Sequence, residues 1–180
     1  MRDMLSEELR DKMRRIRILI LDVDGVLTDG GIFIDDEGRE TKRFDVRDGH
    51  GLKMLMRCDV EVILLTGRTS KVVEHRALDL GIKEVYQGVW NKLEVFEDIS
   101  RKKNISREEI AFVGDDLVDV PVLKRAGFSA SVADAAEDVK RVVDYIAERP
   151  GGKGAVREIC EIILKAKEKW PEVTARYELF

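Results

Sequence analysis

Short apolar runs alternate with segments of helical periodicity along most of the chain. Consecutive aliphatic residues that end in polar or turn residues are typical of buried strands. They occur at 16–23, 60–66, 84–88, 110–116 and 128–132. Apolar positions three and four residues apart predict helices at 49–57, 70–80, 92–103, 118–126 and 154–170. The alternation predicts an α/β fold, with a Rossmann-like open parallel sheet and helices on both of its faces.

Two segments depart from this alternation. Residues 30–46 read as two short strands around a turn at 35–38, which predicts a β-hairpin inserted directly after the first strand. The tail at 150–180 begins with a glycine-rich stretch that we expect to act as a flexible hinge, and its last ten residues look loosely attached. A length of 180 residues suits one domain spanning 1–180.

Charge and cysteine content exclude several classes of protein. The 32 basic and 36 acidic residues are mixed along the chain, so we expect no nucleic-acid partner. The first fifteen residues are charged throughout, which argues against a signal peptide or a membrane span and favours a cytoplasmic protein. Cys58 and Cys160 lie in apolar periodic segments without CxxC spacing, and we expect both to be reduced core thiols.

Polar residues stand at the carboxyl ends of four predicted strands. Asp22 and Asp24 follow the first strand, residues 66–68 end the second, Lys92 follows the third, and Asp115 ends the fourth. Acids after one strand alone would make an ordinary turn. Ligands bind where the carboxyl ends of parallel strands converge, so four such ends predict a functional site there.

The order of these motifs resembles the haloacid dehalogenase superfamily of phosphatases. The matching segments are "DVDGVLTDG", "TGR", a lysine and "GDDLVD". The resemblance implies that Asp22 is a nucleophile that attacks phosphorus and that Asp24 is the general acid and base. It also implies that Lys92 binds the phosphate and keeps Asp22 ionised, while Thr66 binds phosphoryl oxygens.

The resemblance also implies a magnesium ion at this site. An aspartate and a phosphate repel each other, so the site must supply positive charge, and Mg²⁺ prefers oxygen ligands. The expected ligands are the Asp22 side chain, the backbone carbonyl of Asp24 and the Asp115 side chain. Asp116 and Asp119 remain open: each could cap the following helix, or by resemblance lie close to the metal site.

A finer resemblance covers about 16–165 and points to the capless phosphatases of 3-deoxy-D-manno-octulosonate 8-phosphate. It includes "FDVRDGHG", "YQGVWNK" and "GGKGAVREIC". Neither gap between the motifs has room for a cap domain. The resemblance implies a cytoplasmic, Mg²⁺-dependent homotetramer that releases phosphate and the sugar acid used in the lipopolysaccharide inner core.

Such a substrate carries a carboxylate, many hydroxyls and a phosphate, and it calls for arginines. We therefore expect arginines and the loop at 45–49 to contact the substrate, although Arg76 could instead be a surface residue. The expected substrate-binding residues are Asp24, Asp45, Val46, Arg47, Asp48, Gly49, Arg68, Arg76 and Lys92. In the family the glycine-rich tail segment closes over a neighbour's site, which makes Lys153 and Arg157 candidate contacts.

Two other functions remain open at this point. A phosphatase of a nine-carbon sugar acid 9-phosphate, of the sialic acid type, would share every catalytic residue. Related domains fused to sugar-acid nucleotidyltransferases could serve only as oligomerisation modules. In each case the hairpin predicts a homo-oligomer with neighbouring hairpins packed together, because a lone two-stranded ribbon exposes its edges.

Overall fold

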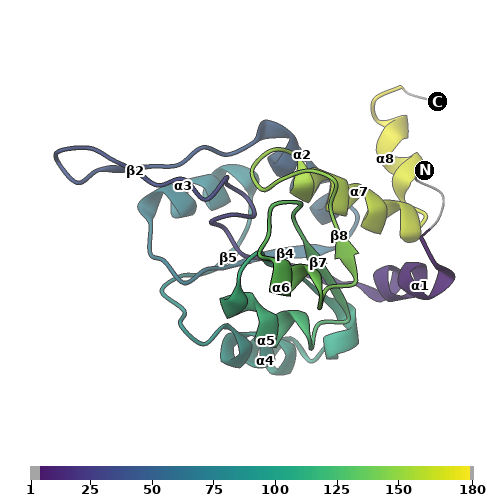
Figure 1. Ribbon diagram of the computed structural model, residues 1–180. Coiled ribbons are helices and arrows are strands. Elements are labelled where there is room, and N and C mark those ends of the chain that lie inside the picture. The colour runs from purple at the N-terminus through teal and green to yellow at the C-terminus, as the bar shows by residue number, and fades with distance from the viewer. Residues whose placement is uncertain (1–4, 179–180) are drawn as a thin grey trace.

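The computed structural model describes residues 5–178, and within them a six-stranded parallel sheet lies between two layers of helices (Figure 1). The strand order is β5-β4-β1-β6-β7-β8. The strands are β1 (Ile18–Leu21), β4 (Glu61–Leu65), β5 (Glu84–Tyr86), β6 (Ile110–Val113), β7 (Phe128–Ser131) and β8 (Tyr145–Ile146). The predicted fold class is confirmed.

The centre of the sheet is also the centre of the core. β1 pairs in parallel with both β4 and β6, which places Ile20 beside Ile63 and Phe112. Every residue of β1 and β6 is buried. Because helices cover both faces of the sheet, these strands carry continuous aliphatic runs instead of an alternating pattern.

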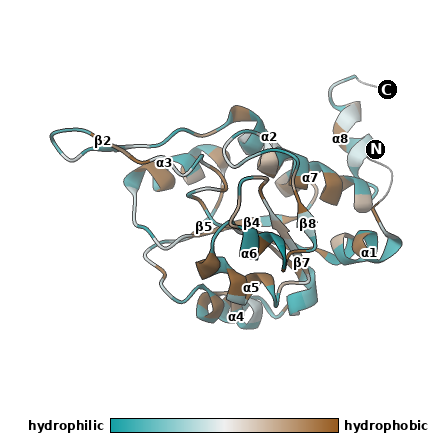
Figure 2. Cartoon of the chain, viewed as in Figure 1, coloured by the Kyte–Doolittle hydropathy of each residue, from teal (hydrophilic) through white to brown (hydrophobic). Residues whose placement is uncertain are grey.

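The helices form two layers, with α2, α3 and α7 on one face of the sheet and α4 and α5 on the other (Figure 1). Hydrophobic and hydrophilic residues are interleaved along most of these helices (Figure 2), and the hydrophobic ones of α7, such as Ile159 and Ile163, are buried. The bounds are α1 (Glu7–Arg15), α2 (Val46–Arg57), α3 (Lys71–Leu80), α4 (Lys92–Lys103), α5 (Val120–Leu123), α6 (Glu137–Lys140), α7 (Ala155–Ala166) and α8 (Trp170–Ala175). The predicted stop of α3 at Gly81 is confirmed, with φ +81° at that residue.

Several boundaries differ from the sequence-based expectation. α2 begins at Val46 because the Asp45 carboxylate caps it by accepting the Arg47 N–H at 2.6 Å. The helix expected at 118–126 is instead a short 3₁₀ turn followed by α5, and β8 was not predicted at all. The expectation of a loosely attached tail was also wrong for the described residues of α8, because Val173 and Thr174 are buried.

The predicted hairpin consists of β2 (Phe33–Ile34) and β3 (Glu40–Thr41), which pair antiparallel and project from the body of the protein (Figure 1). Its turn is held by Asp35, whose carboxylate accepts the Glu37 N–H at 3.0 Å. The described residues contain no cap domain, as expected. Among residues 5–178, the carboxyl edge of the sheet is therefore covered by loops and by the base of this hairpin.

Two expectations from composition can be checked directly. Cys58 and Cys160 are both buried free thiols. Between residues 5 and 178, none of the helices has the length and apolar character that a membrane crossing requires.

Phe112 provides a test of the core. It lies in the central strand β6 and has no exposed surface, so Phe112→Ala leaves a cavity between sheet and helices. We expect the free energy of unfolding to fall by about 3–5 kcal/mol, measured by urea denaturation. Leu78→Ala, at a side chain that is 79% exposed on α3, is the control and should change it by less than about 0.5 kcal/mol. Equal losses in the two variants would contradict this assignment of the core.

Candidate active site

Three carboxylates from two neighbouring strand ends meet at the carboxyl edge of the sheet. Asp22 follows β1, and Asp115 and Asp119 lie in the loop and 3₁₀ turn after β6. One oxygen from each lies within 4.8 Å of the others. The parallel pairing of β1 with β6 brings these ends together, and the Asp22 N–H extends it by donating to the Val113 carbonyl at 3.0 Å.

Lys92, the first residue of α4, inserts its ammonium group between two of these acids. Its Nζ lies 3.0 Å from Asp22 Oδ2 and 2.6 Å from Asp119 Oδ1. The lysine is only 3% exposed and Asp119 is fully buried. A buried ammonium is tolerated when carboxylates surround it, so the pairing fixes both partners in place.

Asp119 also shapes the loop that carries Asp115. Its Oδ2 accepts the backbone N–H groups of Asp115 at 3.0 Å and Asp116 at 3.3 Å. Asp116 has a capping role, because its side chain accepts the Leu117 N–H at 2.7 Å. Sequence reasoning left the role of Asp119 open, and only its burial beside Lys92 separates it from an ordinary helix cap.

The electrostatics of the cluster favour protonated acids in the metal-free protein. Burial raises the pKa of Asp115 to about 7, and the charges of Asp22 and Asp119 add to this rise. Burial likewise raises the pKa of Asp22 to about 6, although Lys92 opposes the shift. Burial alone lowers the pKa of Lys92, but the two carboxylates outweigh it and raise this pKa overall. With all three acids ionised, the cluster would carry more negative charge than Lys92 neutralises.

The geometry around Asp115 fits a hard divalent cation. Its Oδ1 is buried, and no donor among the described residues satisfies it. The cluster offers only carboxylate oxygens, which Mg²⁺ prefers. Gly25, with φ +86°, lets the loop after β1 approach, since a Cβ there would lie 2.0 Å from Asp115 Oδ2. The residues present therefore fit a Mg²⁺ ion held by the side chains of Asp22 and Asp115.

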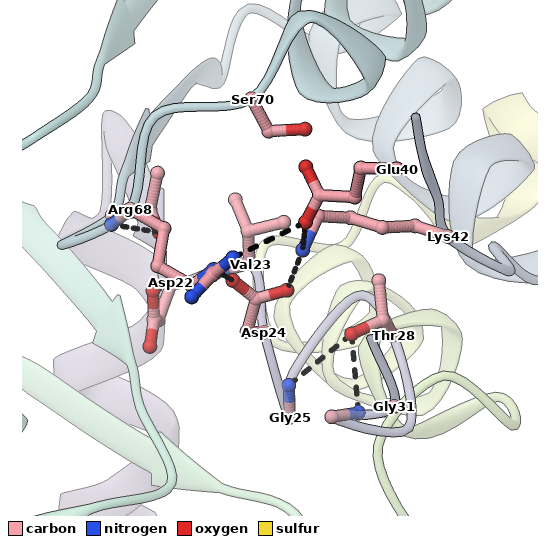
Figure 3. A network of polar contacts seen from close by, with 12 residues as sticks. Asp22, Val23, Asp24, Gly25, Thr28, Gly31, Glu40, Lys42, Arg68 and Ser70 are labelled. Carbon is pink, nitrogen blue, oxygen red and sulfur yellow. Dashed lines mark hydrogen bonds and ion pairs between the residues drawn. The ribbon is translucent and has the colours of Figure 1, made fainter. Parts of the chain in front are cut away.

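The side chain of Asp24 belongs to a second group of charges. Its Oδ1 pairs with Lys42 Nζ, and its Oδ2 lies 3.8 Å from Arg68 Nε (Figure 3). Lys42 and Arg68 also lie 3.1 Å and 3.5 Å from Glu40 Oε1. The hydroxyl of Ser70, together with Lys42 and Arg68, lowers the pKa of Glu40. Sequence reasoning missed Lys42 and Glu40, because nothing in a polar hairpin indicates which side chains turn back to the sheet.

Thr66 lies at the end of β4, where its predicted phosphate contact requires it. The residue is 2% exposed, and its hydroxyl accepts the Arg68 N–H at 3.5 Å. The strand ends thus bring Thr66, Asp22, Asp115 and Lys92 to one edge of the sheet, with the Asp24 side chain directed toward the hairpin.

The segment expected as a substrate-binding loop is mostly the first turn of α2. Asp48 is 1% exposed, and its two oxygens accept the N–H groups of Gly154 at 3.2 Å and Arg157 at 2.8 Å. It joins α2 to the start of α7 and does not face the acidic cluster. Gly49 is packed against Arg76, and a Cβ there would lie 2.3 Å from Arg76 Nη2. Val46, in contrast, is 80% exposed.

The two candidate arginines occupy different surroundings. Arg68 faces Asp24 and Glu40, whereas Arg76 donates to the Asp45 carbonyl at 3.3 Å and lies 5.5 Å above the Phe44 ring. Within the described residues they share no contact partner. A cavity of about 560 Å³ lies apart from the cluster, along α7 and β8, and Arg47 and Arg157 are among its lining residues.

The glycines of the tail pack tightly against the loop after β1 of the same chain. Gly151 and Gly152 are buried, and the Gly152 N–H donates to the Val26 carbonyl at 3.0 Å. A Cβ on Gly151 would lie 1.8 Å from the Gly25 carbonyl oxygen. The expected flexible hinge is therefore wrong: these glycines permit a close contact that supports the loop after β1.

Comparison with known proteins places this arrangement in a defined class. Residues 80–159 match the haloacid dehalogenase-like hydrolase family. The 3-deoxy-D-manno-octulosonate 8-phosphate phosphatase of Escherichia coli is 46% identical over 168 residues, which cover 93% of this chain and 89% of that protein. The fold and the strand-end acids are thus those of a haloacid dehalogenase-like hydrolase.

Solved structures identify one family within the haloacid dehalogenase-like hydrolases. The enzyme of the same name from Moraxella catarrhalis, crystallised with a magnesium ion, a phosphate ion and a KDO molecule, superposes with a TM-score of 0.94 at 40% identity, covering 96% of this chain and 99% of that one. The Yersinia pestis phosphatase gives a TM-score of 0.91 at 40% identity, covering 93% and 90%. The chain belongs to the family of 3-deoxy-D-manno-octulosonate 8-phosphate phosphatases.

The raised pKa values make metal binding pH-dependent. Between about pH 4 and pH 7 the native metal-free protein keeps protons on Asp22 and Asp115 that the unfolded chain has already lost, so its stability falls as the pH rises through this range and changes little above it. Mg²⁺ needs the deprotonated acids, so it should raise the melting temperature more at about pH 8 than at about pH 6.

Differential scanning fluorimetry with and without Mg²⁺ checks this pH dependence. The variant Asp115→Asn removes a ligand charge and should show little Mg²⁺-dependent shift at either pH. Equal shifts at both pH values in the wild type would contradict the assignment.

Proposed function

We propose that this chain hydrolyses 3-deoxy-D-manno-octulosonate 8-phosphate to the free sugar acid and inorganic phosphate, with Mg²⁺ as cofactor. The observation that carries the proposal is the buried cluster in which Lys92 holds Asp22 at 3.0 Å beside an unsatisfied Asp115 oxygen. The relatives that share the fold are named for this substrate, and the Moraxella catarrhalis structure contains magnesium, phosphate and KDO.

The reaction needs two transfers of the phosphoryl group. Asp22 Oδ forms a bond to phosphorus as the bond from phosphorus to the sugar oxygen breaks, and Asp24 gives that oxygen a proton. Asp24 then takes a proton from water, whose oxygen attacks phosphorus and releases Asp22 and inorganic phosphate. When bound, Mg²⁺ supplies positive charge to the phosphoryl oxygens. Lys92 opposes the rise that burial causes in the pKa of Asp22, and it orients this carboxylate for both transfers.

The charges at the site favour a substrate that carries an additional acid group. Arg68 is 49% exposed at the edge of the site, and it can leave Glu40 to pair with a carboxylate. This chemistry also suits a nine-carbon sugar acid 9-phosphate, but the Escherichia coli relatives, at 46% identity, are named for the eight-carbon compound. Cytoplasmic location and a role in lipopolysaccharide inner-core synthesis are parts of the same proposal.

A purely structural module is less consistent with the site. A lysine that is 3% exposed between two buried acids gives little stability compared with an apolar core of the same size. Such an arrangement is understandable when it serves chemistry. The unsatisfied oxygen of Asp115 points the same way, because buried polar atoms without partners are rare.

The catalytic assignment is tested by phosphate release from the eight-carbon and nine-carbon sugar acid phosphates. The wild type with Mg²⁺ should prefer the eight-carbon substrate in kcat/KM, and a chelator should abolish turnover. Asp22→Asn removes the nucleophile and should lower kcat at least about a thousandfold, or about 4 kcal/mol in barrier.

Asp29→Asn is the matched control in the same segment, because the Asp29 carboxylate pairs with Arg43 at 2.5 Å outside the acidic cluster. It should retain wild-type activity. Unchanged turnover in Asp22→Asn, or none in the wild type, would reject the enzyme; a preference for the nine-carbon acid would reject the substrate.

We also propose that the chain forms a homotetramer through its hairpins. Ile32, Phe33 and Ile34 are 40%, 60% and 64% exposed on a two-stranded ribbon that stands clear of the body (Figure 1). Such ribbons are marginal alone and gain stability when their apolar side chains and free edges are covered. Packing of hairpins from neighbouring subunits would cover both.

Phe33→Glu places a charge in this proposed contact and should reduce the molar mass to that of a smaller species, measured by size-exclusion chromatography with light scattering. Leu78→Glu, at an apolar side chain that is 79% exposed on α3, is the control and should leave the mass unchanged. A tetramer that survives Phe33→Glu, or a wild-type monomer, would exclude assembly through the hairpins.

A further inference from the structure

We propose that Lys42, at the base of the hairpin, is a positioning residue that holds the Asp24 carboxylate in the orientation needed for proton transfer to the leaving oxygen. This inference rests on the proposed phosphatase function, and it deepens it by giving the hairpin a part in the chemistry. Lys42 is neither a metal ligand nor a phosphate ligand in this view. It acts through Asp24.

The burial of Lys42 is the first observation. Its side chain has no exposed surface, although it lies at the base of a projecting hairpin. Lysines are almost never fully buried unless they are paired, because a desolvated ammonium group costs several kcal/mol. Here the ammonium contacts Asp24 Oδ1 and, at 3.1 Å, Glu40 Oε1. The Lys42 ammonium group is therefore held between two carboxylates, those of Asp24 and Glu40.

The contacts of Asp24 are the second observation. One oxygen meets Lys42, while the other lies 3.8 Å from Arg68 Nε, beyond hydrogen-bond distance (Figure 3). The Arg68 side chain is 49% exposed, whereas the Lys42 side chain has no exposed surface. The lysine is thus the rigid partner. It occupies one carboxylate oxygen, and the other oxygen faces the half-exposed Arg68 without a hydrogen bond to it, so this second oxygen is the one available for proton transfer.

A general acid must lie within about 3.2 Å of the oxygen that it protonates, so a small rotation of Asp24 stops proton transfer without disturbing Asp22. The hairpin itself has a second anchor. Arg43 Nη2 lies 2.5 Å from Asp29 Oδ2, and Arg43 is 62% exposed. Loss of the Lys42 contact should therefore leave the hairpin attached and remove chiefly the orientation of Asp24.

The test compares Lys42→Met with the wild type on two substrates in the presence of Mg²⁺. The sugar acid phosphate has an alkoxide leaving group that must be protonated as it departs. The leaving group of p-nitrophenyl phosphate departs as a stabilised phenolate and needs no acid. We expect kcat/KM of Lys42→Met to fall about a hundredfold on the sugar acid phosphate and about threefold or less on p-nitrophenyl phosphate.

Two further variants serve as the positive and the negative control for Lys42→Met. Asp24→Asn should show the same substrate-selective loss, because it removes the acid that Lys42 positions. Arg43→Met, at the neighbouring exposed cation, should show no selective loss. Asp24 also activates the water that hydrolyses the aspartyl phosphate, so kcat is expected to fall on both substrates in Asp24→Asn. The comparison therefore uses kcat/KM, which reports the first phosphoryl transfer, and a retained kcat/KM on p-nitrophenyl phosphate shows a folded active site in each variant.

The outcomes separate the two proposals. If the wild type releases no phosphate from the sugar acid phosphate, the proposed function fails. If the wild type is active and Asp24→Asn is selective, but Lys42→Met loses both activities equally or neither, then Lys42 is only structural and this inference is overturned. A selective loss in Lys42→Met that matches Asp24→Asn supports it.

Discussion

Repulsion among carboxylates at one edge of the sheet is the constraint on which the site depends. Asp22 and Asp115 follow strands that are parallel neighbours, so their separation is set by the sheet and not by their charges. Lys92 offsets part of the repulsion, and burial together with the remaining repulsion raises the pKa of Asp115 to about 7. The buried strands β1 and β6 keep the acids together until a cation neutralises them.

Close backbone contacts complete the site from distant parts of the chain. The loop after β1 lies between Asp115 and the glycine-rich segment before α7, and it reaches both because glycines stand at the contacts. Gly25 admits the Asp115 carboxylate, and Gly151 admits the Gly25 carbonyl. A segment more than a hundred residues further along the chain thereby supports the loop that carries Asp24.

The hairpin combines two physical roles at its two ends. Its outer part presents Phe33 and Ile34 to solvent, which favours association with another subunit. Its base directs Glu40 and Lys42 toward Asp24. In a phosphatase without a cap domain, the same insertion can therefore assist assembly and order the acid, and the two roles need different kinds of side chain at different positions.

Strand identity and the positions of Asp22, Thr66, Lys92 and Asp115 could be predicted from the sequence. Apolar runs mark buried strands, and parallel connections bring their carboxyl ends together, so residues at those ends converge whatever the details of packing. The end of α3 at Gly81 could likewise be predicted, because it depends only on the local preference of glycine for the left-handed conformation.

Tertiary structure alone decided the directions of side chains that reach across elements. Asp48 turns to the start of α7, Asp119 pairs with Lys92, and Lys42 reaches back to Asp24. None of these choices has a local pattern, because a polar residue near a helix end or in a hairpin is equally compatible with solvent. Glycine is ambiguous for a similar reason: its missing side chain allows both a flexible hinge and a tight contact, and only the neighbours of Gly151 determined which one forms.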